Sequence, residues 1–600
     1  MCASCRENGF QWRCHDCLAE PVLCSDCCRN MHGRLPFHRV SKWKDNTFCR
    51  SSLLKAGVTL DLGHGGNNED DESDGDDEFF EVVSGGIQFE KMRLRKDLDR
   101  DGNPILLIVD INGIHQIRAR FCRCAHGRDI QRNVQLLQMG LYPATDGKPK
   151  TAFTFRLLDN LITDNLETKT TIVKYYAKLQ RLTSEPFAHL VPDQTRELQR
   201  ANREWRNIRH IQRAGFAHDK ERAIGEDDLA LFCPTCPQPG INLPSDYLTD
   251  SQRPFLSIHT SGSWKYKRTL SADGNFKQDH YIMKNPTDDV KLSDGHGYMV
   301  SRGPYQEYLK NNPHSSTEKS TCNEHRAVNN QNVSRAHLDC TGIGAIACGR
   351  HGCFYPHSVV DFQKGEQQRN MDYAFVQAIN YIKVLLLILM LYDVMCQYWI
   401  KFLFRIDKAV GLSIPANLDI HRGIGLFHVH GHQKDCFARY APTFIPGTGM
   451  LDGEIIETLW SVLNDTASSA RAMSISHRQE YLDAHMYDSN YKKMIHMVPT
   501  LLRKWKRTLP MVVESQSDFR YLDLAVTAKE RKEWGALESA AQRDRNVNVE
   551  AMDIYDVREA PTKAELEHFL ANKEQSDSNP EGCAAWISMG VAITEKQYVS

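Results

Sequence analysis

The cysteines near the start of the chain constrain its fold more than any other feature of the sequence. Seven of the 19 cysteines fall within the first 28 residues, and most of them form Cys-x2-Cys pairs that two histidines follow. The candidate ligands are Cys2, Cys5, Cys14, Cys17, Cys24, Cys27, His32 and His38. These ligands suffice for two tetrahedral zinc ions, and closed cysteine and histidine shells are structural. Because about fifty residues bury little apolar area without a metal, we expect this head to fold around zinc.

Zinc modules of the cross-brace type suggest how these ligands divide. By analogy with them, the first site uses Cys2, Cys5, Cys24 and Cys27, and the second uses Cys14, Cys17, His32 and His38. Cys28 can replace Cys27 in the first site. The alternative is a loop-rich segment with free thiols. Heads of this type often bind proteins, so a chromatin or protein partner is a further expectation.

The rest of the composition is that of an ordinary globular protein with several structural units. The 600 residues include 74 basic and 76 acidic side chains, and 41% are apolar. This balance excludes a disordered or fibrous protein, and the length excludes a single small module. The chain opens without the basic and apolar segments of a secretory signal, so we expect a reducing compartment and no disulfide framework. The apolar run at 384–391 is much shorter than the roughly 20 residues of a membrane span, so we expect no membrane contact.

Charge and hydrophobic patterns divide the chain into five parts. An almost purely acidic stretch at 69–78 predicts a solvated linker. Alternating strand-like and helix-like patterns between 257 and 497 predict an α/β domain. The expected parts are a zinc-binding head at 1–50, an acidic linker at 51–87, a cysteine-containing domain with a basic helical region at 88–245, an α/β core at 250–500 and a charged, partly helical end at 501–600.

A basic stripe marks the helical pattern at 172–222. Its arginines recur at spacings of three and four, at Arg196, Arg200, Arg203, Arg206, Arg209 and Arg213. Residues at these spacings line one side of a helix. The stripe is compatible with contact to DNA. It is also what the solvated face of an ordinary amphipathic helix looks like.

Further cysteines and histidines suggest metal sites outside the head. Cys122 and Cys124 would share one face of a strand, and Cys233 and Cys236 form a Cys-x2-Cys pair. The two pairs together could make one four-thiolate zinc site, or they could be buried cysteines without a metal. If the segment at 428–436 is extended, His430 and His432 share a face with Cys436 nearby, which would fit another structural zinc site. Histidines hydrogen-bonded in a polar loop are the alternative.

Four carboxylates are candidates for catalysis. Asp393 follows the apolar run at 384–391, which predicts a buried central strand with an acid at its tip. Asp273 is a second candidate, although Asp-Gly between short strands is also a common hairpin turn. Glu454 and Glu457 share one face of a predicted helix. Carboxylates from separated segments can hold two magnesium or manganese ions for phosphodiester transfer, but each acid alone could equally be a surface group.

A series of ordered motifs gives the chain a family resemblance. The cysteine and histidine head, with the segments 110–115, 121–124 and 232–237, resembles the cysteine-cluster domain attached to KDZ (Kyakuja-Dileera-Zisupton) transposases of fungi. The likeness continues through the segments 273–276, 350–352, 364–366, 370–373, 392–397 and 452–461. It therefore covers most of the chain, and it identifies residues 88–245 as the cysteine-cluster KDZ-associated domain.

The resemblance implies a DDE transposase with an RNase-H-like core, which is a mixed sheet flanked by helices. Asp273 and Asp393 match the two family aspartates, and Glu457 in its Glu-x-x-Trp-Ser setting is favoured as the third acid over Glu454. The implied cofactors are structural zinc and catalytic magnesium or manganese. The implied partner is the DNA of transposon ends in the nucleus, with a homo-oligomer as a further possibility. A non-catalytic, zinc-dependent DNA- or chromatin-binding protein derived from a transposase is the alternative, and a purely protein-binding module would leave the carboxylates unexplained.

Overall fold

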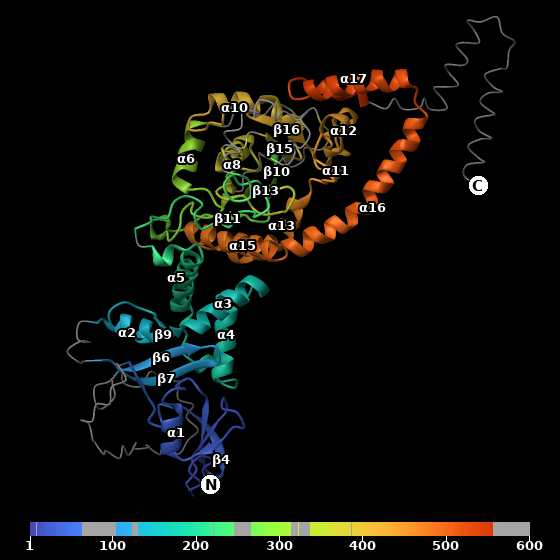
Figure 1. Ribbon diagram of the computed structural model, residues 1–600. Helices are drawn as coiled ribbons and strands as arrows, with labels where there is room; N and C mark the ends of the chain where they lie inside the picture. Colours follow the sequence, from blue (N-terminus) through green and yellow to red (C-terminus); the bar gives the residue numbers. More distant parts are fainter. Residues whose placement is uncertain are drawn as a thin grey trace, which may run out of the picture.

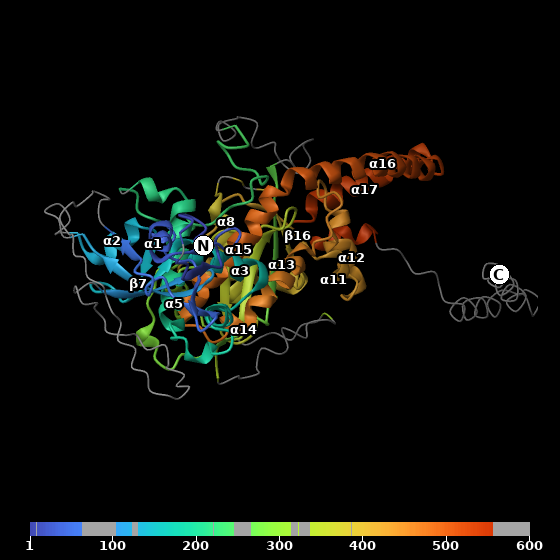
Figure 2. The ribbon, with the colours of Figure 1, turned by 90° about the horizontal axis from the view of Figure 1, so that it is seen from below.

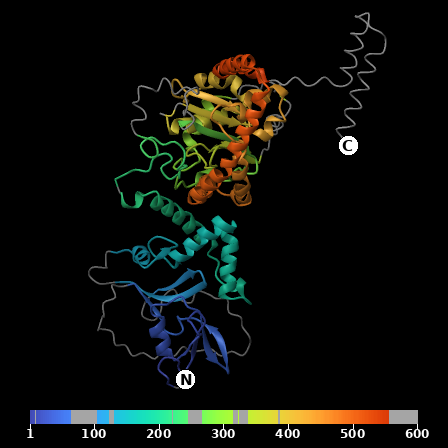
Figure 3. The ribbon, with the colours of Figure 1, turned by 45° about the vertical axis from the view of Figure 1, so that its right-hand side comes forward.

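The computed structural model describes residues 1–62, 104–122, 130–244, 266–313, 322, 337–383, 385 and 387–555, apart from Asn8 and Lys220. These residues form an N-terminal lobe and a larger core, and helix α5 (Thr195–Arg213) runs between them (Figure 1). Figure 3 shows the same division from another side, with the N-terminus at the far end of the lobe. The acidic stretch at 69–78 and the segment after 555 lie outside the described residues.

The N-terminal lobe contains two sheets that share one apolar core. The head sheet, in the order β2-β1-β3-β4, consists of β1 (Trp12–Cys14), β2 (Val22–Leu23), β3 (Val40–Lys44) and β4 (Thr47–Ser51), beside helix α1 (Ser25–His32). The second sheet, in the order β5-β7-β6-β9-β8, consists of β5 (Thr59–Asp61), β6 (Ile105–Asp110), β7 (Gly113–Arg120), β8 (Leu141–Pro143) and β9 (Thr151–Thr154). Side chains from both sheets, such as Trp12 and Ile108, are buried in one cluster.

This shared core changes the boundary expected at residue 50. β5 pairs in parallel with β7, so the folded lobe continues to residue 62 and the segment 51–62 is not a linker. The strand predicted at 105–109 is confirmed as β6, between β7 and β9. The helices of the lobe are α2 (Arg132–Gln138), α3 (Phe155–Thr168) and α4 (Ile172–Thr183). Apolar side chains of α3 and α4 pack on β6, which gives the sheet a second buried face.

The core is built on a mixed five-stranded sheet in the order β14-β13-β10-β15-β16. Its strands are β10 (Arg268–Asn275), β13 (Gly342–Cys348), β14 (Val360–Phe362), β15 (Leu387–Tyr392) and β16 (Asp419–Gly423). β10, β15 and β16 are parallel, and β13 is antiparallel to both of its neighbours. β15 is buried between β10 and β16 because its side chains are apolar on both faces. The predicted mixed α/β core is therefore confirmed.

Helices cover both faces of this sheet. α8 (Gln368–Tyr381) packs with α10 (Phe402–Lys408) on one face, and α13 (Ile455–Leu463) packs with α15 (Ile475–Ile495) on the other. The described part of the core also contains α6 (Arg302–Asn311), α9 (Met395–Tyr398), α11 (Leu426–Val429), α12 (Lys434–Tyr440) and α14 (Ala467–Ala470). A two-stranded sheet joins β11 (His280–Tyr281) to β12 (Leu338–Cys340). The core also includes residues before 245, because Leu229 N–H donates to His296 O at 2.8 Å, so the boundary expected at 245 lies too late.

Two long helices follow α15. α16 (Met497–Leu524) has Met497 as its buried residue and extends away from the core, as Figure 2 shows. α17 (Ala528–Asp544) and the 3-10 segment η11 (Val549–Tyr555) return to the core. There Asn546 donates to Asp419 at 2.6 Å, and the Arg439 guanidinium pairs with Asp553 at 2.7 Å.

Candidate active site and metal centres

Two aspartates lie side by side at one end of the central sheet. In the adjacent parallel strands β10 and β15, Ala272 is paired with Tyr392. Asp273 and Asp393 directly follow these two residues. Because Ala272 is buried on the α8 face, strand alternation directs Asp273 to the face that α13 covers. Asp393 lies just beyond the end of β15, near enough for its charge to raise the pKa of Asp273. The hairpin alternative for Asp273 is wrong, since β10 stays paired with β13 through Asp273 and as far as Asn275.

Helix α13 brings two glutamates to the same place. Glu454 immediately precedes the helix, and Glu457 lies in its first turn. The Trp460 indole N–H donates to Asp273 Oδ2 at 2.6 Å and so ties α13 to β10. Glu454 Oε1 accepts from Phe427 N–H at 3.2 Å, and its Oε2 lies 3.2 Å from His428 Nε2. Glu457 is exposed.

Two glycines allow the chain around Glu454 to approach α11. A Cβ at Gly425 would lie 1.9 Å from Glu454 Oε1. Gly453 has a φ of +85°, and a Cβ there would lie 2.8 Å from Gly425 Cα. No side chain fits at these distances, so glycine at both positions lets Glu454 reach its partners in α11.

Glu366 is a fifth acid in this region, and sequence reasoning gave it no role. It is buried just before α8 and accepts a hydrogen bond from the Tyr392 hydroxyl. A Cβ at Gly274 would lie 2.8 Å from Glu366 Oε2, so Glu366 reaches the residue next to Asp273. The segment 364–366 is one of the motifs that carry the family resemblance, and this could have indicated a role for Glu366.

Burial and neighbouring carboxyl groups dominate the electrostatics of the site. Burial raises the pKa of Asp273 well above its ordinary value, and Asp393, Glu366 and Glu457 raise it further. Burial and Asp393 raise the pKa of Glu366 to about 8. Burial also raises the pKa of Asp393, although His428 opposes this effect. Within the described residues no ion pair joins a lysine or arginine to Asp273 or Asp393. Oxygen donors without a basic partner suit magnesium or manganese.

In the described residues, cysteines and histidines form compact groups of possible metal ligands. In four such groups all ligand atoms lie within 4.8 Å of one another, and the carboxylates described above do not form such a group. In the head, the groups are Cys2, Cys5, Cys24 and Cys27, and Cys14, Cys17, His32 and His38. The structure thus brings together the two sets expected by analogy with cross-brace modules. Cys28 does not replace Cys27, because its side chain is buried beside His32.

The distances within the head groups fit tetrahedral zinc. Zinc–sulfur bonds of about 2.3 Å place the sulfurs of one tetrahedron about 3.8 Å apart. Cys5 Sγ and Cys24 Sγ are 3.9 Å apart, and Cys17 Sγ lies 3.6 Å from His32 Nε2. His32 Nδ1 lies 2.8 Å from Cys28 O, which leaves Nε2 for the metal.

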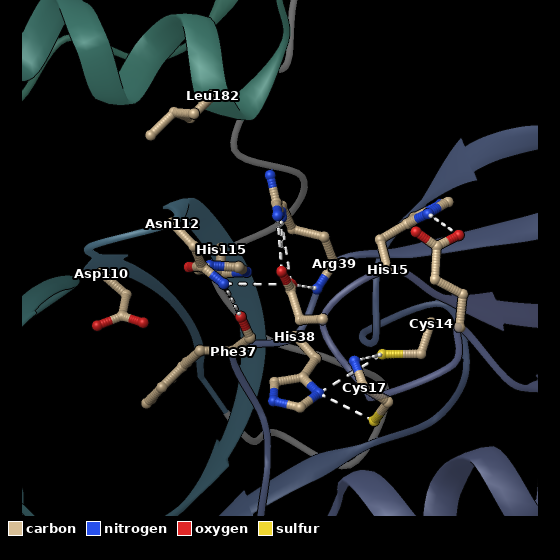
Figure 4. A network of polar contacts seen from close by, with 12 residues as sticks. Cys14, His15, Cys17, Phe37, His38, Arg39, Asp110, Asn112, His115 and Leu182 are labelled. Atoms are coloured by element: carbon tan, nitrogen blue, oxygen red, sulfur yellow. Dashed lines mark hydrogen bonds and ion pairs between the residues drawn. The ribbon is translucent and has the colours of Figure 1, made fainter.

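A polar network links the second head group to the neighbouring sheet (Figure 4). Arg39, which follows the ligand His38, donates from its backbone and its guanidinium to Asp16. Asn112, in the turn between β6 and β7, donates to Asp16 at 3.2 Å and to Phe37 O at 2.8 Å. The loop that carries His38 is therefore fixed to the second sheet through side chains of both.

The site expected from Cys122, Cys124, Cys233 and Cys236 is wrong. Cys233 and Cys236 form a compact group with Cys348 and His351, in which Cys236 Sγ and Cys348 Sγ are 3.2 Å apart. Cys122 lies just after β7 in the N-terminal lobe, and Cys124 lies outside the described residues. The physical reason is that the end of β13 carries Cys348 to the 233–236 turn. The Cys-x2-His spacing of Cys348 and His351 was the signal that could have revealed this.

The expected site of His430, His432 and Cys436 needs a similar correction. The segment is not extended, because it contains the end of α11 and the start of α12. This turn directs His430 against the Phe437 ring, with centroids 5.1 Å apart. His432 and Cys436 instead group with Cys322 and Cys396, two cysteines that sequence reasoning left unassigned. Cys396 lies three residues after Asp393 in the sequence, and this proximity could have indicated that Cys396 belongs to a group near the carboxylates.

Two protein-family models match parts of the chain. Residues 266–490 match the model of the Kyakuja-Dileera-Zisupton transposase. Residues 96–186 match the model of the CxC2-like cysteine cluster associated with KDZ transposases. The two matches support a KDZ family protein with a cysteine-cluster domain. Comparison with curated proteins gave no match, and comparison with solved structures gave none.

Membership of the KDZ family implies transposase function. The KDZ match begins two residues before β10 and ends in α15, so it includes all five acids of the site. The cysteine-cluster match includes β6, β7 and the α3–α4 pair. Among the described helices, none has the length and apolar character that crossing a bilayer requires.

The basic stripe of this KDZ protein is largely engaged within the molecule. On α5, Arg203 pairs with Glu480 of α15 at 2.6 Å, Arg206 is buried, and Arg209 pairs with Asp159 of α3. These contacts join the N-terminal lobe to the core. They favour the structural interpretation of the stripe over contact with DNA along its whole length.

Proposed function

We propose that this KDZ protein is a DDE-type transposase that cleaves and joins phosphodiester bonds at transposon ends, with a core of the RNase-H-like class. The observation that carries the proposal is the pair of aspartates that directly follow the paired residues Ala272 and Tyr392 of adjacent parallel strands, with Glu454 and Glu457 at the start of α13 beside them. The mixed sheet flanked by helices is the arrangement that the resemblance implies for such a core. The proposed partner is transposon-end DNA, and the proposed location is the nucleus.

The side chains of the site have different roles in the proposed reaction. Asp273 is fixed within β10, Asp393 directly follows β15, and Trp460 orients Asp273 through its N–H. Both oxygens of Glu454 already have partners in α11, so we assign the third acid to Glu457, which is exposed on the same turn of the helix. Glu454 then holds α11 against the site. When bound, two magnesium or manganese ions would activate the attacking hydroxyl and stabilise the leaving oxygen.

Zinc is the proposed structural metal of the four cysteine and histidine groups. Their donor sets contain four cysteines, two cysteines with two histidines, or three cysteines with one histidine. Closed sets of this kind are those of structural zinc sites. None of them supplies an open position for the reaction.

The test uses the full chain and the terminal DNA of the element that encodes it, with Mn²⁺. We expect Asp273→Asn, Asp393→Asn and Glu457→Gln each to reduce strand cleavage at least about a hundredfold, because each removes a metal ligand. Asp288→Asn, an exposed aspartate outside the site, is the matched control and retains cleavage. Mn²⁺ binding measured by electron paramagnetic resonance should weaken in the same three variants. A wild-type chain that binds zinc and DNA without binding Mn²⁺ would support the non-catalytic alternative.

A further inference from the structure

One metal centre of the core lies beside the proposed active site. Its ligand atoms are Sγ of Cys322, Cys396 and Cys436 and Nδ1 of His432; we call it the Asp393-side cluster. His432 Nδ1 lies 3.3 Å from Cys322 Sγ and 3.4 Å from Cys396 Sγ. The three thiols are buried, and separations of this size are close to the edge of a zinc tetrahedron.

The cluster joins elements that carry the acids. Cys396 is in α9, which begins two residues after Asp393, and Cys436 is in α12. His432 lies in the turn between α11 and α12, four residues after His428, whose Nε2 is 3.2 Å from Glu454. A metal held here therefore fixes the segment after Asp393 to the segment that holds Glu454.

These elements are too short to be stable without such a link. α9 and α11 have four residues each, and α12 has seven. Isolated helices shorter than about 12 residues are marginal in water. A metal that binds ligands from α9, α12 and the turn between α11 and α12 supplies the missing constraint.

The other core cluster lies further from the aspartates along the sheet and offers a comparison. Cys348, which groups with Cys233, Cys236 and His351, is paired with Leu270 on β10. Asp273 is three residues further along that strand, about 10 Å away at roughly 3.4 Å per residue. Loss of this second cluster should thus leave the tips of β10 and β15 in place.

We propose that the Asp393-side cluster binds a zinc ion that positions Asp393 for the catalytic divalent ions and keeps α11 in contact with Glu454. The inference rests on the proposed function for the role of these acids. Its ligands are positioning residues, because they act through the backbone of α9 and of the turn between α11 and α12.

The experiment compares zinc content and Mn²⁺ affinity in the full-length protein. Wild type should contain about four zinc ions, one for each cluster. Cys436→Ser and Cys236→Ser should each lose one. Mn²⁺ affinity, measured by electron paramagnetic resonance, should fall about tenfold or more in Cys436→Ser, as for other residues that orient metal ligands. It should fall much less in Cys236→Ser, and Cys49→Ser, an exposed cysteine outside the clusters, should match wild type in both measurements.

Two further measurements keep the outcome decisive. Cys436→His preserves a zinc-binding donor set, so it should regain the zinc and most of the Mn²⁺ affinity if Cys436→Ser loses them. Hydrogen exchange should rise at 393–400 and 425–440 in Cys436→Ser but not in Cys236→Ser. The proposal is overturned if Cys436→Ser keeps four zinc ions, or loses one with unchanged exchange and Mn²⁺ affinity. If wild type binds no Mn²⁺, the proposed function fails, while zinc content and exchange still decide whether the cluster orders these segments.

Discussion

Asp483 shows how a single buried carboxylate affects the stability of the core. It lies on α15 and accepts hydrogen bonds from Tyr298 N–H at 2.9 Å and Met299 N–H at 2.8 Å. Burial raises its pKa to about 7, although the two N–H groups lower it. Between pH 4 and pH 7 the folded state therefore binds more protons at this residue than the unfolded state does. The free energy of unfolding then falls as the pH rises, by up to about 1.4 kcal/mol per pH unit.

This linkage predicts the behaviour of Asp483→Asn. The amide oxygen can still accept the two backbone hydrogen bonds, and the side chain no longer titrates. We expect the stability of the variant, measured by urea denaturation, to fall less between pH 5 and pH 7 than that of wild type. Asp288→Asn, at an exposed position, should keep the wild-type slope. Identical slopes for Asp483→Asn and wild type would show that Asp483 titrates normally in the folded protein.

At the level of secondary-structure elements, the contact between α11 and the start of α13 can be tested by mutation. Gly425 has a φ of −55°, which alanine adopts easily, so the obstacle to a side chain there is Glu454 Oε1. Gly425→Ala should displace Glu454 and reduce strand cleavage about tenfold, as for other residues that orient metal ligands. In a protein that already carries Glu454→Ala, adding Gly425→Ala should reduce strand cleavage little further, because the two changes act on one contact.

A glycine in α17 provides the matched control for this element. A Cβ at Gly535 would meet nothing within 4 Å, and the residue lies inside a helix. Gly535→Ala should therefore leave cleavage unchanged and raise stability by roughly 0.5–1 kcal/mol. Equal losses of cleavage in both alanine variants would contradict the role assigned to Gly425.

The N-terminal lobe behaves as one unit at the scale of the whole molecule. The head shares its apolar core with β6 and β7, and β5 joins the second sheet. Cys14→Ser removes a ligand of the second head group and should therefore loosen the neighbouring sheet as well as the head. Hydrogen exchange should rise in residues 11–51 and also at 105–120, while Cys49→Ser, outside the groups, should leave both regions protected. Protection that persists at 105–120 would show that the head folds independently.

Features that depend on local spacing could be predicted from the sequence alone. A Cys-x2-Cys pair can reach one metal from a single turn, so the half-sites of the head could be predicted before any fold was known. An uninterrupted apolar run predicts a strand buried on both faces, and β15 with Asp393 at its tip has this form. The ordered motifs likewise identified the KDZ family, which the family comparison confirms.

Contacts between distant segments could be seen only in the folded protein. The register of β10 against β13 and β15 put Asp273 within a strand, whereas the dipeptide Asp-Gly alone is equally suited to a hairpin. The end of β13 gave Cys236 its partners, and the turn between α11 and α12 gave His432 partners 36 and 110 residues away in the chain. Contacts of this kind depend on how strands and helices pack, and spacing along one segment carries no information about the segment that packs against it.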